Sequence, residues 1–176
     1  MKRKIFSFWA LICAFVSLAA TAPKDAPYRI EVKMTDIKDT SKVFLAFYYN
    51  GKTYSKDTAQ FNGKGVAVFD GSKRKDKEKQ RLEEGMYIVY FKQDKFFDLL
   101  VGKDQNIKLK ADTTDLTPVV TQGEESVYFS KLVKFMSDKN KERKDFVEAK
   151  KAGKIDSVTF EAKLKKLSDE VEAFQK

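Results

Sequence analysis

Carboxylates are the strongest candidates for catalytic or metal-binding chemistry in this sequence of 176 residues. The sequence has no histidine, and its single cysteine and single tryptophan, Cys13 and Trp9, both lie close to the N-terminus. A chain that has lost residues 1–19 therefore cannot form a disulfide, a Cys-x-x-Cys redox pair or a Ser-His-Asp triad. It also cannot bind zinc through cysteine or histidine ligands.

The aspartates that could supply such chemistry are scattered at predicted turns and strand ends. A carboxylate metal site or a glycosidase-type pair needs two acids held close together, and the spacing pairs none of these residues. Aspartate at a turn commonly accepts hydrogen bonds from the neighbouring backbone. We therefore predict no catalytic residue, no metal and no cofactor, so that the protein is not an enzyme. The aspartates considered are Asp57, Asp70, Asp98, Asp104 and Asp112.

The N-terminal residues are typical of a secretory signal peptide. Lys2, Arg3 and Lys4 precede an apolar stretch that ends in small residues. That stretch is shorter than the roughly 20 apolar residues of a transmembrane helix. We predict cleavage after Ala19, or alternatively after Ala22, and hence an exported, periplasmic or secreted protein without a stable membrane span. The alternative is an uncleaved membrane anchor.

The charge of the chain does not indicate a nucleic-acid partner. The net charge is +9, and it falls to +6 without residues 1–19. Basic residues nearly always have an acidic neighbour in the sequence, whereas nucleic-acid binders concentrate positive charge on one face or arm. We expect a solvated surface with many ion pairs and no nucleic-acid binding.

Residues 28–122 show the short alternating segments of an antiparallel β domain. Residues 28–34 alternate apolar and polar side chains, and Asn50-Gly51 is a favoured hairpin turn. Residues 72–84 interrupt this pattern with ten charged residues, and they predict an exposed, mobile loop. The expected strands are 28–34, 43–49, 52–54, 58–61, 66–69, 86–92, 96–101 and 106–111.

The apolar pattern changes to a helical period in residues 123–176. We expect helices at about 124–138, 141–152 and 156–175, with Gly153 ending the second. The whole pattern predicts an α+β fold: an antiparallel β-sandwich or partly open barrel followed by a C-terminal helical segment.

The last predicted helix has an apolar seam with spacings of 4, 3, 4 and 3 residues. The seam could pack on the preceding helix as a helical hairpin, which we favour. It could instead form an interface with another domain or a second copy of the chain. Two heptads are too short to be stable as an isolated coiled coil. The candidate interface residues are Phe160, Leu164, Leu167, Val171 and Phe174.

A set of turn and core residues spread over about residues 28–136 carries a resemblance to a known module. They are Tyr54, Asp57, Thr58, Gly65, Phe69, Gly71, Gly85, Met86, Tyr87, Phe97–Leu100, Asp104, Gln105, Leu109, Asp112, Thr113, Gly123, Glu124, Glu125 and Phe129. The pattern resembles the uncharacterised N-terminal β-rich module that precedes thioredoxin-like (AhpC/TSA or TlpA-type) domains in exported bacterial proteins.

The chain departs from this family where it matters for chemistry. Ser126 stands where an asparagine is usual, the loop at 72–84 is long, and the sequence stops at Lys176, where the thioredoxin-like domain would begin. With no Cys-x-x-Cys, we expect an exported non-catalytic accessory or interaction module with a protein partner. The alternative is the N-terminal, substrate-positioning part of a truncated or split thioredoxin-like thiol-disulfide oxidoreductase, with the missing downstream domain as its partner. The sequence does not indicate an oligomeric state.

Overall fold

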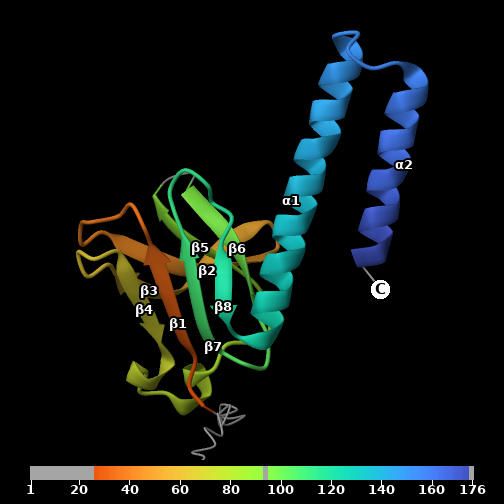
Figure 1. Cartoon of the computed structure of the whole chain (residues 1–176). Helices are drawn as coiled ribbons and strands as arrows, with labels where there is room; N and C mark the ends of the chain where they lie inside the picture. The colour runs from red at the N-terminus through yellow and green to blue at the C-terminus, as the bar shows by residue number, and fades with distance from the viewer. Residues whose placement is uncertain (1–25, 93–94, 175–176) are drawn as a thin grey trace, which may run out of the picture.

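The computed structural model describes residues 26–92 and 95–174, which form two facing β-sheets followed by two long helices (Figure 1). This arrangement confirms the predicted α+β fold with sandwich-like sheets, and the sheets do not close into a barrel. The strands are β1 (Arg29–Met34), β2 (Lys42–Tyr49), β3 (Lys52–Gln60), β4 (Val66–Asp70), β5 (Gly85–Lys92), β6 (Lys95–Val101), β7 (Asn106–Ala111) and β8 (Val119–Gln122). The helices are α1 (Glu124–Lys151) and α2 (Ser157–Phe174), and two short 3-10 turns are η1 (Gly71–Lys73) and η2 (Lys77–Gln80).

The first sheet, sheet A, has the strand order β4-β1-β7-β8, and the second, sheet B, has the order β3-β2-β5-β6. In the described residues, all strand pairs are antiparallel except β1 with β7, which run parallel in register from Arg29 with Asn106 to Met34 with Ala111. The expectation of a purely antiparallel domain was therefore wrong at this pair. Turn residues in the sequence predict the pairing of two consecutive strands in a hairpin. They do not predict the pairing of β1 with β7, because the chain passes through sheet B between these two strands.

Alternating side chains from both sheets fill the space between them. In β1, Ile30, Val32 and Met34 are fully buried in the core, as the period-2 pattern predicted. The predicted Asn50-Gly51 turn joins β2 to β3 with positive φ values of 49° and 71°. Beyond it, the two short strands expected at 52–54 and 58–61 form the single strand β3, whose register shifts where Ala46 pairs with Ser55. This β-bulge lets one strand continue past an irregular sequence.

The charged segment 72–84 is more ordered than the sequence suggested. The Asp70 carboxylate accepts the Ser72 amide hydrogen at the start of η1, and Asp76 does the same for Glu78 at η2. Leu82 is 5% exposed and packs into the core. Most charged side chains of the segment are exposed, as expected, but these aspartate caps and the buried leucine hold its backbone in place.

The helical segment consists of two helices rather than three. α1 continues through residues 138–141, where a break was predicted, because the sequence there contains neither glycine nor proline. Lys139 and Glu142 form an ion pair of 3.1 Å across this region. α1 starts beside β6 and β8, and its second half extends beyond the sheets with α2 alongside (Figure 1). Neither helix, nor any other in the described residues, is long and apolar enough to cross a membrane.

Candidate interaction surfaces

The predicted seam of α2 packs along α1, so the two helices form a hairpin. Phe174 stacks on Phe135 with ring centroids 4.1 Å apart and an angle of 8° between the ring planes. Among the described residues, α2 has no buried side chain, and Phe174 is 37% exposed. Phe160, Leu164, Leu167 and Val171 are half-buried. The hairpin thus covers the seam only in part.

Lysines complete the contact between the helices. The Lys150 ammonium lies 4.4 Å from the centroid of the Phe160 ring, and the Lys163 ammonium lies 4.6 Å from that of Phe146. Lys139 pairs with both Glu142 and Glu170. Such cation–π contacts at partly exposed sites stabilise by roughly 0.5–1 kcal/mol each, so each of them contributes only modestly to the stability of the hairpin.

The outer faces of the two sheets differ sharply in chemistry. On sheet A, the side chains that alternate with the core residues of β1 and β7 are charged or polar. Register places Glu31 beside Lys108 and Lys33 beside Lys110, as expected for a face in contact with water. The outward side of β1 and β7 is therefore solvated, whereas Val66 and Val68 of β4 and the exposed Val119 of β8 make the rest of this face partly apolar.

The outer face of sheet B is apolar over three neighbouring strands. Ala46 and Ile88 pair across β2 and β5, and both are buried although neither belongs to the core between the sheets. Phe44 stacks on its cross-strand neighbour Tyr90 with centroids 4.9 Å apart. We call this surface the sheet B face; its residues are Phe44, Ala46, Tyr48, Met86, Ile88, Tyr90, Phe96 and Leu100, with Asp98 among them.

The described residues leave much of the sheet B face open to solvent. Tyr48 is 58% exposed, Met86 46% and Phe96 45%. The sequence carried a signal for this surface, because residues 43–49 are apolar at successive positions, a pattern typical of strands covered on both sides. Such a run predicts a more deeply buried strand. In the structure, the core side of β2 is covered and its other side is partly open to solvent.

The tip of the β2–β3 hairpin carries two more exposed tyrosines, which lie on the side of Phe47, opposite to the sheet B face. Tyr49 and Tyr54 are 61% and 43% exposed, and their rings meet edge to face with centroids 6.4 Å apart. Tyr54 also stacks on Phe47, which packs against the core. The tip is therefore a rigid aromatic extension of sheet B.

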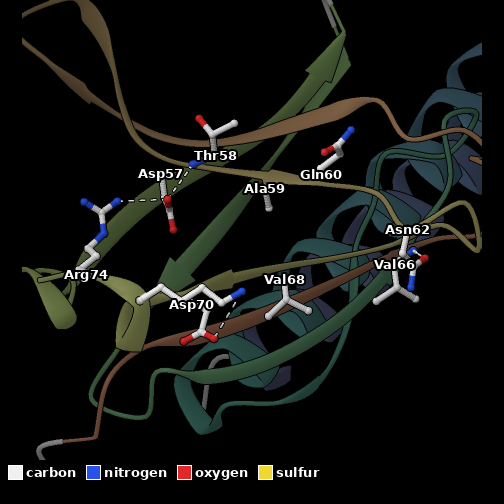
Figure 2. Close-up of a pocket in the computed structure, with 10 residues that line it drawn as sticks. Asp57, Thr58, Ala59, Gln60, Asn62, Val66, Val68, Asp70 and Arg74 are labelled. Atoms are coloured by element: carbon white, nitrogen blue, oxygen red, sulfur yellow. Dashed lines mark hydrogen bonds and ion pairs between the residues drawn. The ribbon is translucent and has the colours of Figure 1, made fainter.

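A polar groove lies between the edge strands β3 and β4 (Figure 2). These strands are on the side of the sandwich away from α1 (Figure 1). Asp57 and Arg74 point toward one another in it, with 3.2 Å between Arg74 Nη2 and Asp57 Oδ1. Behind them, the fully buried Tyr28 donates its hydroxyl hydrogen to Asp57 at 2.7 Å and accepts one from Arg74 Nε at 2.8 Å. Burial raises the pKa of Tyr28 to about 12, and the hydrogen bond to Asp57 acts in the same direction.

These side chains protect the free edge of β3. The Asp57 carboxylate accepts the Thr58 amide hydrogen at 2.8 Å, and Arg74 Nη2 donates to the Lys56 carbonyl oxygen at 2.5 Å. Both backbone groups would otherwise be free to pair with another strand. The network thus ties the charged segment to β3 and blocks its edge, so it explains the groove without a ligand.

The other aspartates considered from the sequence make the local hydrogen bonds predicted for them. Asp104 accepts the Asn106 amide hydrogen at 3.0 Å, and Asp112 accepts those of Thr114 and Asp115 at 2.8 and 2.6 Å. Asp98 lies apart from them on the sheet B face. In the part of the chain that the structure describes, no three acidic, cysteine or histidine side chains form a group that could bind a metal ion.

No protein-family model matches the chain, and no curated protein matches it.

Proposed function

We propose that this chain is an exported, non-catalytic interaction module that binds a protein partner through the sheet B face. The observation that supports this most is that β2 and β5 are apolar on both sides while only one side faces the core. Large apolar surfaces rimmed by polar residues mark interaction sites in soluble proteins. In sheet A, by contrast, the outward side chains of the central strands β1 and β7 are charged or polar.

The residue types of this face favour a polypeptide as the occupant. Tyrosine, phenylalanine and methionine are enriched at protein–protein interfaces, and rigid aromatic side chains often dominate their binding energy. A second copy of the chain is a less favourable occupant, because each copy carries an excess of positive charge.

The non-catalytic part of the proposal is supported by the roles of the carboxylates. The Asp57 carboxylate accepts hydrogen bonds from Tyr28 and Thr58 and forms an ion pair with Arg74. The carboxylates of Asp104 and Asp112 accept hydrogen bonds from backbone amides in turns. A catalytic carboxylate needs access to a substrate proton or carbon, which these hydrogen bonds restrict.

Site-specific photocrosslinking in the native host tests the proposal. A photoreactive amino acid at Tyr90 should crosslink the full chain to one protein partner, and the paired change Tyr48→Ser with Met86→Ser should abolish that product. The matched control places the same photoreactive residue at Lys108 on the outer face of sheet A, where no specific product is expected.

Two outcomes would contradict the proposal. Equal crosslinking from Tyr90 and Lys108 would show that the sheet B face has no preference for a partner. A product made only of two copies of this chain, with a dimer in sedimentation of the purified protein, would replace the partner with self-association. A thioredoxin-like protein as the crosslinked partner would support the resemblance noted from the sequence.

A further inference from the structure

A second surface without a partner lies along one side of α1. It forms a shallow groove, here called the α1 groove, on a side of the helix different from the one that meets α2. The residues of the groove are Leu132, Val133, Met136, Ser137, Asn140, Lys141 and Lys144. The residues that contact α2 are instead Phe135, Lys139, Phe146 and Lys150.

The two ends of the α1 groove have different chemistry. Leu132, Val133 and Met136 make its first half apolar, and all three are only half-buried. Val133 also lines a neighbouring pocket between α1 and β6, so the apolar surface continues toward the sheets. A partner at this end must therefore present apolar side chains.

The second half of the groove is cationic. Lys141 and Lys144 line it, and neither forms an ion pair with any residue of the described chain. Lys134 and Lys139 of the same helix do form ion pairs, the first with Asp138 and the second with Glu142 and Glu170. What sets Lys141 and Lys144 apart from the other lysines of α1 without an ion pair is their position in the groove next to its apolar half, where they favour a partner with carboxylates.

The dimensions of the groove fit a short helix. Residues 132 to 144 of a helix span about 18 Å at 1.5 Å per residue, which equals three turns of a helical partner. Ser137 and Asn140 in the middle are small enough for another helix to approach closely, and ridges of one helix commonly pack into such a groove of another.

We propose that the α1 groove binds a short amphipathic helix of a protein partner, with apolar side chains against Leu132, Val133 and Met136 and carboxylates against Lys141 and Lys144. This helix-in-groove recognition adds a second binding site to the module. It is distinct from the sheet B face, because the residues of the two surfaces do not overlap.

A designed probe tests this site on the full chain. The probe is a fluorescein-labelled synthetic helix with leucines on one face of its first half and glutamates on the same face of its second half. A second peptide with the reverse order covers the opposite binding direction. Fluorescence anisotropy should show saturable binding of at least one peptide, and a version with lysine in place of glutamate should bind more weakly.

Charge reversal identifies the site. The paired change Lys141→Glu with Lys144→Glu should weaken binding of the glutamate peptide by about tenfold or more and strengthen binding of the lysine peptide. The matched control is Lys131→Glu with Lys151→Glu, which changes the net charge equally on exposed positions of the same helix outside the groove. Met136→Asp should weaken both peptides.

The site would be ruled out by absence of saturable binding, or by equal weakening in the groove and control variants, which would indicate only general charge attraction. The Tyr48→Ser and Met86→Ser protein should bind the peptide like the wild type. This variant changes the sheet B face alone, and the lysine variants change the α1 groove alone. The two proposed binding sites can therefore fail independently, and the peptide assay reports only on the α1 groove.

Discussion

Gln105 forms two hydrogen bonds with the backbone of Leu82: its Oε1 accepts the Leu82 amide hydrogen at 2.9 Å, and its Nε2 donates to the Leu82 carbonyl oxygen at 2.8 Å. Gln105 is 3% exposed and Leu82 is 5% exposed. The side chain thereby replaces a strand partner for a residue at the end of the charged segment, and it anchors that segment to the loop before β7.

The first prediction concerns this anchor. Gln105→Ala should lower the free energy of unfolding by about 2 kcal/mol, because it leaves two buried backbone groups without partners. Urea denaturation monitored by circular dichroism measures the change. Gln60→Ala, at an exposed glutamine, should stay within about 0.5 kcal/mol of the wild type. Similar losses in both variants would show that the Leu82 contact is unimportant.

The second prediction concerns the raised pKa of Tyr28. Because the folded-state pKa of about 12 lies above the ordinary tyrosine pKa of 10.0, the folded protein holds this proton more tightly than the unfolded chain does. The resulting stabilisation is complete below about pH 10 and is lost as the pH rises toward 12. Urea denaturation of wild type and Tyr28→Phe across this range should therefore show a steeper decline for the wild type.

Tyr48→Phe serves as the control for this titration, because Tyr48 is 58% exposed and lies on the sheet B face. It should show the same decline with pH as the wild type. Parallel curves for wild type and Tyr28→Phe would mean that the buried hydroxyl does not contribute.

The third prediction compares two glycines in turns. Gly65 and Gly51 both have positive φ, but a Cβ at Gly65 would lie 2.1 Å from the Met34 carbonyl oxygen, whereas one at Gly51 meets nothing within 4 Å. Gly51→Ala should cost about 1 kcal/mol of stability from backbone strain. Gly65→Ala should cost about 3 kcal/mol or more, since the backbone of β1 must also move. Thermal unfolding of the two variants checks the order, and equal shifts would contradict it.

The fourth prediction concerns the helical hairpin. Leu167→Asp places a charge in the half-buried seam and should detach α2 from α1, with loss of part of the helical circular dichroism signal. The sandwich should keep its unfolding transition, because α2 contributes nothing to its core. Val158→Asp is the control, since Val158 is 77% exposed on the same helix. Sedimentation of each variant shows whether the seam also holds two copies together, and a monomer with unchanged helicity after Leu167→Asp would contradict both roles.

The fifth prediction concerns export. Mass spectrometry of the protein recovered outside the cytoplasm should find an N-terminus at Ala20 or Pro23, as the signal-peptide pattern indicates. A recovered protein that still begins at Met1 would overturn the cleavage prediction.

Local sequence signals predicted the elements of the fold well where neighbours in sequence are also neighbours in space. Asn50-Gly51 indicated its hairpin because few residues tolerate positive φ at two successive positions. The parallel pairing of β1 with β7 has no such local signal, and β8 was missed because Val119–Gln122 is short and partly polar. The helix break expected near residue 140 was wrong because residues of weak helix propensity do not end a helix that ion pairs support.

The candidate surfaces were harder to predict for a different reason. The apolar run at 43–49 indicates burial on both sides of β2, but only the packing of β1 and β7 against one side reveals which face stays open. The α1 groove was hard to predict because the sequence does not show which lysines form ion pairs. Lys139 pairs with Glu170, whereas Lys141 lines the groove. The resemblance to a thioredoxin-associated module stays a prediction.

The lack of buried side chains in α2 has a consequence for the motions of the protein. A helix held only by half-buried contacts and exposed ion pairs opens at a free-energy cost far below that of unfolding the sandwich. We therefore expect α2 and the second half of α1 to open as a separate cooperative unit, whose amide hydrogens should exchange before those of β1 or β7. During each opening, Phe135 and Phe146 are uncovered, and another helix could take the place of α2.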